Sequence, residues 1–200
     1  SEMARKASVQ LALLYFNTNQ LDKAMSAYKQ VVSDYPGSEE ATTALQDLKT
    51  VYLEKDDVQG YAAYLRTVNT NVKFEVTEQD SLTYLSAERI YARGDAAAAE
   101  RAFGNYLQSY PEGAFMVNAN YYLGSIFFAR KDYARASSAF ERVLSIPQNK
   151  FAEDALARSS EIAYLENNFD KALNYFKQLE AMASKPENIR AAKLAVLRCA

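Results

Sequence analysis

Side chains that could support catalysis are scarce in this 200-residue sequence. It contains no histidine and a single cysteine, Cys199. These absences exclude Ser-His-Asp triads, Cys-His pairs and histidine-ligated metal sites. The six glycines form no G-x-G-x-x-G motif and no phosphate-binding loop. We therefore predict a protein that is not an enzyme, with no catalytic residues, no metal site and no cofactor.

Paired carboxylates are the remaining option for acid–base chemistry. Glu88 and Glu161 are both expected to face the inner side of the protein, and carboxylates that hydrolyse glycosides lie roughly 5–9.5 Å apart. The two glutamates belong to helical hairpins two repeats apart, and at roughly 8–10 Å per packed layer they should be about 20 Å apart. At that distance they cannot act on one substrate.

The overall charge gives no indication of a charged partner. The chain has 23 basic and 25 acidic residues, a net charge of -2, so it has no long-range attraction to nucleic acid or to an anionic membrane. Its longest apolar run, Leu11 to Phe16, is far shorter than the roughly 20 residues that cross a bilayer. We expect no nucleic-acid partner and no direct membrane insertion.

An internal repeat is the strongest signal in the sequence for its secondary structure. A small residue is followed four positions later by an aromatic one, and about twelve residues upstream lies a second position for small residues. About twelve residues downstream a proline often ends the helix. The small and aromatic pairs are Ala24 and Tyr28, Ala99 and Phe103, Ala136 and Phe140, and Ala172 and Phe176.

The repeat predicts an all-α protein of five helical hairpins with spacings of 36 to 38 residues. Within each hairpin the turn is short and rich in residues that end one helix or cap the next, such as Arg93-Gly94-Asp95. Short turns make the two helices antiparallel neighbours. The predicted hairpins cover residues 5–36, 42–70, 80–111, 117–147 and 153–185, with one more helix at 187–200.

These residues resemble tetratricopeptide repeats, whose two small positions and one aromatic position are matched here by Leu123-Gly124, Ala136 and Phe140. The match extends over nearly the whole chain. The resemblance implies a single right-handed α-α superhelix, or solenoid, over residues 1–200. In such a packing Gly124 and Ala136 let two helices cross closely, and Phe140 fills the space beside them.

The resemblance also implies where a partner binds, because in this family the first helix of each hairpin lines a concave groove. We therefore predict a non-catalytic scaffold that binds a peptide or a helix there. The inner-face positions are Gln46, Thr50, Leu53, Tyr84, Glu88, Tyr91, Asn118, Tyr121, Ser125, Phe128, Ala157, Glu161 and Tyr164. Tyrosine and phenylalanine offer large contact areas, and amides can pair with a peptide backbone. The alternative is that these aromatics only pack between neighbouring helices.

The charge of the predicted groove favours some partners over others. Glu54, Glu88, Asp154 and Glu161 make it mildly acidic, so a neutral or basic segment should suit it. It lacks the set of lysines and asparagines with which some family members hold a C-terminal carboxylate.

The second hairpin departs from the pattern, because Tyr61 stands at the small position and Gly60 opens the helix. It is followed by residues 69–80, where Val72, Phe74 and Val76 alternate with charged residues as in a strand. Two interpretations are open. The segment is either a loop that places Phe74 in the core or an edge that pairs with a partner strand.

Both ends of the chain carry apolar residues that a capped array would cover. On the first helix Val9, Leu13 and Phe16 occupy positions expected to face the groove, and the helix at 187–200 has no second helix after it. We therefore expect a segment of a longer array, with self-association through the exposed ends as a further possibility.

A narrower resemblance concerns the links between hairpins. The segments Tyr35–Ala41 and Tyr110–Gly113 are similar to repeats of the Gram-negative cell envelope, of the Tol-Pal-associated and outer-membrane-assembly type. This implies a bacterial scaffold in the periplasm or at the envelope, with the cytoplasm as the other location. Two other functions stay open, a docking arm of a larger multidomain enzyme and a helical-repeat RNA binder, although the groove is not basic.

Overall fold

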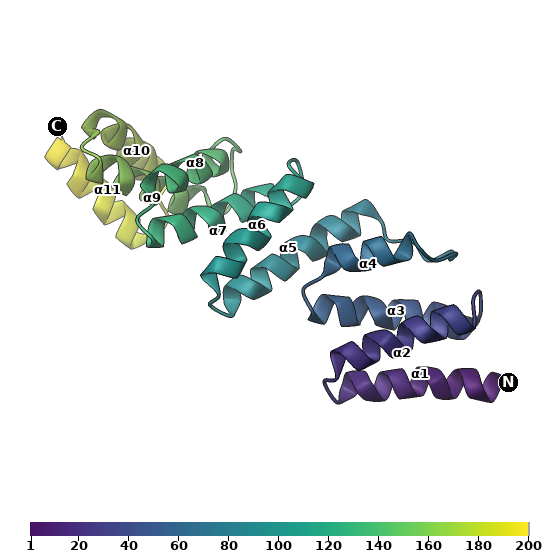
Figure 1. Cartoon of the computed structure of the whole chain (residues 1–200). Coiled ribbons are helices and arrows are strands. Elements are labelled where there is room, and N and C mark those ends of the chain that lie inside the picture. The colour runs from purple at the N-terminus through teal and green to yellow at the C-terminus, as the bar shows by residue number, and fades with distance from the viewer. Residues whose placement is uncertain (200) are drawn as a thin grey trace. The chain divides into compact units, whose positions relative to one another are not determined.

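The computed structural model describes residues 1–199, with side chains up to Val196, and within them all regular secondary structure is α-helix. The helices, labelled in Figure 1, are α1 (Glu2–Asn17), α2 (Leu21–Asp34), α3 (Glu39–Glu54), α4 (Val58–Leu65), α5 (Val76–Ala92), α6 (Ala96–Ser109), α7 (Met116–Ala129), α8 (Tyr133–Leu144), α9 (Ala152–Leu165), α10 (Phe169–Met182) and α11 (Pro186–Cys199). The predicted all-α class is confirmed. Ala200, the predicted end of the last helix, lies outside the described residues, as do the side chains of 197–199, including Cys199.

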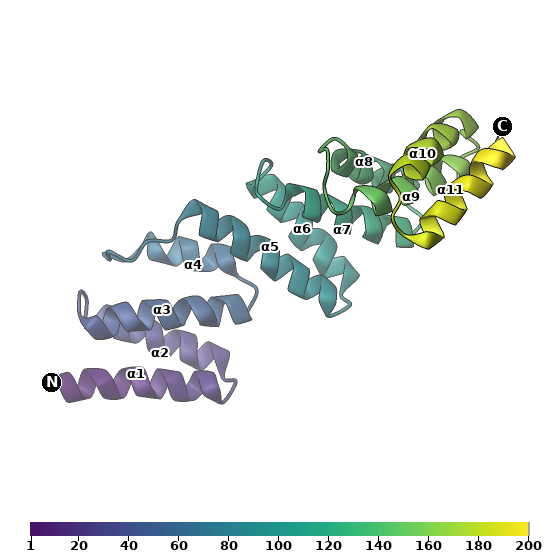
Figure 2. The same ribbon diagram turned by 180° about the vertical axis from the view of Figure 1, so that it is seen from behind.

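Two compact units divide the chain, Ser1–Arg89 and the part from Ile90 onward. The first unit contains α1 to α4 and most of α5, and the second contains the end of α5 and α6 to α11. In each unit consecutive helices run antiparallel, as Figure 2 shows from the opposite side. A single continuous array over residues 1–200 stays a prediction.

The turn inside each hairpin contains one residue with a left-handed backbone. These residues are Asn19, Asp56, Gly94, Lys131 and Asn167, with φ between 55° and 84°. A left-handed residue after a helix lets the chain reverse sharply. Successive positions are 37, 38, 37 and 36 residues apart, so the backbone repeats with the period that the sequence predicts.

Side chains from the turns cap the second helix of four hairpins, as the types of residue in the turns predict. Asp57, Asp95, Asp132 and Asn168 each accept a hydrogen bond from the backbone N–H three residues later. Such a cap satisfies one of the free donors at a helix N-terminus. Ser38 caps α3 in the same way, which explains why this helix begins at Glu39 instead of the predicted 42.

The small positions allow close helix crossing where the repeat is most regular. Ala136 and Phe140 on α8 are fully buried. A Cβ atom added to Gly124 on α7 would lie 2.6 Å from Cε1 of Phe140. Glycine is thus required at this position by space, because the Phe140 ring occupies the volume that a larger side chain would need.

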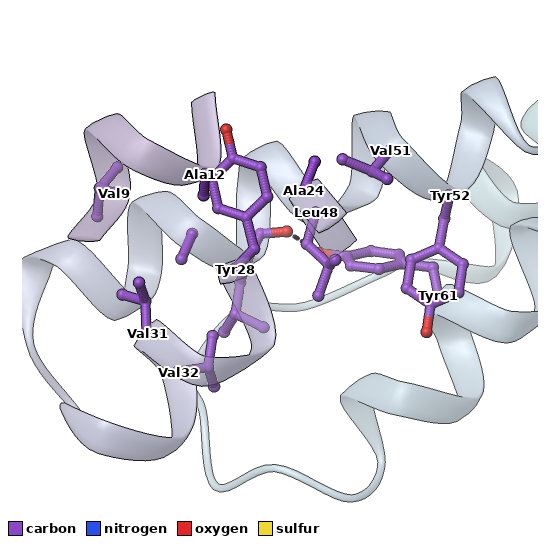
Figure 3. Packing of buried hydrophobic residues seen from close by; sticks show 12 residues of the cluster. Val9, Ala12, Ala24, Tyr28, Val31, Val32, Leu48, Val51, Tyr52 and Tyr61 are labelled. Carbon is purple, nitrogen blue, oxygen red and sulfur yellow. Dashed lines mark hydrogen bonds between the residues drawn. The ribbon is translucent and has the colours of Figure 1, made fainter. Parts of the chain in front are cut away.

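The second hairpin packs differently because Tyr61 replaces the small residue. Tyr61 is buried, and its hydroxyl donates a hydrogen bond of 2.9 Å to the carbonyl oxygen of Leu45 (Figure 3). Its ring lies 5.9 Å from Tyr52 and 5.2 Å from Phe74, measured between centroids. The segment between α4 and α5 is a loop, and it places Phe74 against the core of the first unit. Residues 69–75 of the predicted segment therefore form the loop, whereas residues 76–80 belong to α5 and are helical instead. Pairing with a partner strand stays a prediction.

One expectation for the first helix is wrong. Val9 does not face the groove as predicted, because it is buried with Ala12 against α2, and Phe16 also packs on this core. The large apolar side chains that α1 leaves exposed are Met3, Leu11 and Leu14.

Candidate functional site

A cleft of about 600 Å³ lies in the second unit, and some of the predicted groove residues line it. We call it the α9–α11 cleft, because α9 and α11 form its two sides, while α7 contributes Tyr121 and α10 contributes Phe176 and Leu179. Four predicted groove residues, Tyr121, Ala157, Glu161 and Tyr164, line it. These residues therefore share one cleft, and their role in binding a partner stays a prediction.

The position of α11 depends on the carboxylate of Glu153 at the start of α9. The backbone N–H groups of Ser184 and Lys185 donate to it at 3.0 Å, the Ser184 hydroxyl at 2.7 Å and the Asn188 amide at 2.8 Å. Partial burial favours the neutral acid, but the hydrogen bonds from Asn188, Ser184 and Lys185 outweigh it and lower the pKa of Glu153 from 4.5 to about 2. These bonds tie the α10–α11 link to the beginning of α9.

The helical period places the cleft residues on one face of each helix. On α9, Ala157, Glu161 and Tyr164 follow the i, i+4, i+7 pattern, and on α11 Glu187, Ala191 and Leu194 do the same. Ala157 and Ala191 are small, so the cleft stays open between the helices. Tyr164 and Leu194 are 45% and 49% exposed, which leaves apolar surface available to a partner.

Tyr121 forms the end of the cleft nearest to α7 and is held by its neighbours. Its ring stacks on Phe151 with the centroids 4.4 Å apart, and its hydroxyl donates to Asp154 Oδ2 at 3.5 Å. Burial and the negative charge of Asp154 both raise the pKa of Tyr121. The tyrosine is therefore a neutral and fixed part of the wall.

The charged residues of the cleft are acidic on balance. Asp154, Glu161 and Glu187 line it together with one arginine, Arg158. Arg158 stacks over the Phe128 ring at 4.6 Å and pairs with Glu161 at 3.3 Å, while Asp154 pairs with Lys185 at 2.6 Å. These pairs are exposed and individually weak. The surplus of carboxylates favours a segment that carries positive charge.

Several predicted groove residues are packing residues instead. Tyr84 is only 2% exposed, and its hydroxyl donates to Glu88 at 2.7 Å, so its prediction as groove surface is wrong. Tyr91 is half-buried, with its ring 4.8 Å from Tyr122 and 6.4 Å from Phe103. For these aromatics the alternative interpretation, packing between helices, is the correct one.

The other predicted groove residues lie outside the α9–α11 cleft. Gln46 lines a different hollow in the first unit, and Thr50 is exposed on α3. Asn118 and Ser125 are half-buried on α7, where the Ser125 hydroxyl donates to the Tyr121 carbonyl at 2.9 Å. Phe128 packs beside Tyr133 and under Arg158.

Residues of α10 and α11 also line the cleft, although the sequence pattern did not predict them. Asn188, Ala191, Leu194 and Ala195 line the cleft, and Glu153 positions the helix that carries them. One signal was present in the sequence: Glu187, Ala191 and Leu194 have the same i, i+4, i+7 spacing as the lining residues Ala157, Glu161 and Tyr164 of α9.

Three further predictions concern metal binding, the pair of glutamates and membrane insertion. No group of three His, Cys, Asp or Glu side chains that could hold a metal ion occurs within this part of the chain. Glu88 and Glu161 belong to different units, and their separation stays a prediction. Among the described helices, none is both long enough and apolar enough to cross a membrane.

Comparison with protein families identifies the class. Two models of the tetratricopeptide repeat match residues 6–38 and 84–155, which together make up just over half of the chain. The chain belongs to the tetratricopeptide-repeat family. Repeats of this family act as scaffolds for protein–protein interaction, and that general role applies here. No curated protein matches the sequence significantly.

Solved structures show the same fold at low sequence identity. The TPR domain of P58(IPK) is similar with a TM-score of 0.50 and 16% identity, over 98% of this chain and 55% of that one. The apo form of RapI is similar with a TM-score of 0.52 and 17% identity, over 93% of this chain and 56% of that one. The chain thus spans little more than half the length of both proteins, and the likeness concerns the fold alone.

Proposed function

We propose that the protein is an interaction scaffold that holds a short segment of another protein in the α9–α11 cleft. The observation that carries this proposal is the pair of exposed apolar side chains, Tyr164 and Leu194, on opposite sides of a cleft of about 600 Å³. Apolar anchors beside charged groups are typical of sites that bind peptides.

The shape and charge of the cleft favour a partner of a particular kind. An apolar side chain fits between Ala157 and Ala191, and a basic residue beside it can approach Glu161 and Glu187. An amphipathic helix or an extended segment with this pairing satisfies both features. The mild acidity expected from the sequence supports the same choice.

Selection of peptides from a random phage-displayed library on the immobilised chain tests the proposal. We expect the enriched peptides to combine an apolar and a basic residue, and to lose about tenfold in affinity when Tyr164→Ser or Leu194→Gln is introduced. That loss corresponds to burial of one apolar anchor, about 1.4 kcal/mol. Fluorescence anisotropy measures the affinities.

A matched control is available on the same helix. Leu165 neighbours Tyr164 and is similarly exposed, but it does not line the cleft. Leu165→Ser should leave the affinity unchanged. No enrichment, or an equal loss in Leu165→Ser and Tyr164→Ser, would show that the cleft is not the binding surface.

We further propose that the scaffold works at the cell envelope of a Gram-negative bacterium. The support is the similarity of the Tyr35–Ala41 and Tyr110–Gly113 links to envelope repeats. Fractionation of the native host tests this location, and recovery of the protein in the cytosol alone would contradict it.

A further inference from the structure

The short helix α4 leaves part of the first unit uncovered. It has 8 residues, whereas α2, α6 and α10 have 14 and α8 has 12. Since α4 runs antiparallel to α3, the missing residues would have continued along the N-terminal half of α3. Four to six residues correspond to about 6–9 Å of helix. Figure 2 shows α4 followed by a loop at this point.

A hollow of about 1050 Å³ lies where those turns are missing. We call it the α4 hollow. Its walls are the second half of α2, the first half of α3, Tyr64 near the end of α4 and the loop residues 68–73. Its volume exceeds that of typical small-molecule pockets, roughly 300–1,000 Å³. The hollow therefore has room for several residues of a second chain.

The charge of the α4 hollow is opposite to that of the α9–α11 cleft. Lys29 and Lys73 are among the residues that line it, and no aspartate or glutamate is. Neither lysine forms an ion pair within the part of the chain that the structure describes. Asp34 accepts a hydrogen bond of 2.6 Å from Gln30, one of the lining residues, but does not itself line the hollow.

Lys29 is held in place by aromatic rings. Its ammonium group lies 4.9 Å from the centroid of Tyr64 and 5.3 Å from that of Tyr52. Such contacts orient a cation without neutralising it by a carboxylate. A positioned cation with no acidic partner favours a ligand that supplies the negative charge.

We propose that the α4 hollow binds an extended acidic segment of a partner protein. Its carboxylates pair with Lys29 and Lys73, and its backbone pairs with amides that line the same walls, among them Gln30, Gln46, Asn69 and Asn71. The site lies in the first unit and does not rest on the function proposed for the second. Each can fail without the other.

A peptide is favoured over a nucleic acid by the composition of the site. Two lysines are few compared with the run of phosphate contacts on which single-strand binding depends. The chain as a whole is negative, which opposes a polyanion. Side-chain amides, by contrast, match the donors and acceptors of a peptide backbone.

The test uses two fluorescein-labelled octapeptides with blocked ends, in which alanine alternates with glutamate or with lysine, and the intact 200-residue chain. We expect the glutamate peptide to bind at least about tenfold more tightly than the lysine peptide at low salt. The affinity of the glutamate peptide should fall when the ionic strength rises from about 0.02 M to about 0.3 M, because the paired lysines and carboxylates remain partly exposed to solvent. Fluorescence anisotropy measures both.

Substitutions locate the binding. Lys29→Gln and Lys73→Gln should each lower the affinity for the glutamate peptide by about three- to tenfold. Lys23→Gln should have no effect, although Lys23 is on the same helix and also lies over a tyrosine, at 5.6 Å from Tyr15. Thr42→Trp should block the hollow, whereas Thr43→Trp, on the exposed neighbouring position, should not.

Three results would overturn the proposal. The first is equal binding of the two octapeptides. The second is binding of the glutamate peptide that is indifferent to Lys73→Gln and Thr42→Trp, both of which change exposed side chains that the fold does not need. The third is tighter binding of an octathymidylate strand with the same dependence on Lys29 and Lys73, which would identify a phosphate site.

Discussion

The contact between Gly124 and Phe140 predicts that the effect of Gly124→Ala on stability changes sign when the Phe140 ring is removed. A Cβ atom at position 124 would lie 2.6 Å from Cε1 and 2.8 Å from Cδ1 of Phe140, and the backbone there is not left-handed. Glycine is present because of space alone. Gly124→Ala should therefore be unfavourable while Phe140 is present and favourable once Phe140→Ala has removed the ring.

The expected magnitudes follow from two opposing effects. Alanine is better than glycine inside a helix by about 1 kcal/mol, and overpacking a tight core costs about 1–3 kcal/mol. Gly124→Ala alone should thus cost about 0–2 kcal/mol. Phe140→Ala should cost about 3–5 kcal/mol, since Phe140 is fully buried. In the double variant the added methyl should stabilise by about 1 kcal/mol, so the coupling is about 1–3 kcal/mol.

Urea titrations of the four proteins, followed by circular dichroism at 222 nm, measure these free energies of unfolding. Helical arrays can unfold in parts, so hydrogen exchange of the α7 and α8 amides should assign the change to this hairpin. Gly104→Ala is the control, because Gly104 is an exposed residue of α6 with no atom within 4 Å of an added Cβ. It should stabilise by about 1 kcal/mol whether or not Phe140 is present.

Additive effects of Gly124→Ala and Phe140→Ala would refute the reasoning, because they would mean that the ring does not exclude the methyl. A loss of stability below about 1 kcal/mol for Phe140→Ala would contradict the assignment of the repeat itself. The aromatic position would then not be buried as the repeat requires.

Two further predictions concern pH. Because the pKa of Glu153 falls from 4.5 to about 2 on folding, its contribution to stability is present above pH 4.5 and is lost as the pH falls towards 2. Glu153→Gln should lower the melting temperature at pH 7 and the difference from wild type should shrink below pH 4.5; a difference constant with pH would contradict this. Burial raises the pKa of Tyr61 from 10.0 to about 12, so its contribution is present below pH 10 and is lost between pH 10 and 12. Tyr61→Phe should cost about 1 kcal/mol at pH 7 through the lost bond to Leu45 and reduce alkaline unfolding in that range, as circular dichroism against pH would measure.

Much of the fold could be predicted because its signals are local. A left-handed turn residue and a capping carboxylate act within a few residues of one another, so Gly94 and Asp95 identify one hairpin turn from the sequence alone. The spacing of Ala136 and Phe140 places both on one face of a helix. Class, number of hairpins and period follow from such patterns.

The exposure of single aromatic residues could not be predicted in the same way. Tyr91 and Tyr164 occupy equivalent positions, each three residues before the left-handed residue of its hairpin turn. Yet Tyr91 is half-buried against Tyr122 and Phe103, whereas Tyr164 is 45% exposed. Each residue advances about 100° around a helix, so a small rotation against the neighbouring helices decides which side is covered.

The sites depend on residues far apart in the sequence. The α9–α11 cleft exists because Glu153 binds the backbone of residues about thirty positions later, and the α4 hollow exists because α4 ends early beside α2 and α3. The sequence alone determined the hairpins and their period, since these arise from local backbone chemistry. Only the tertiary structure decided where surface remains open to a partner, because open surface is what is left after distant helices have packed.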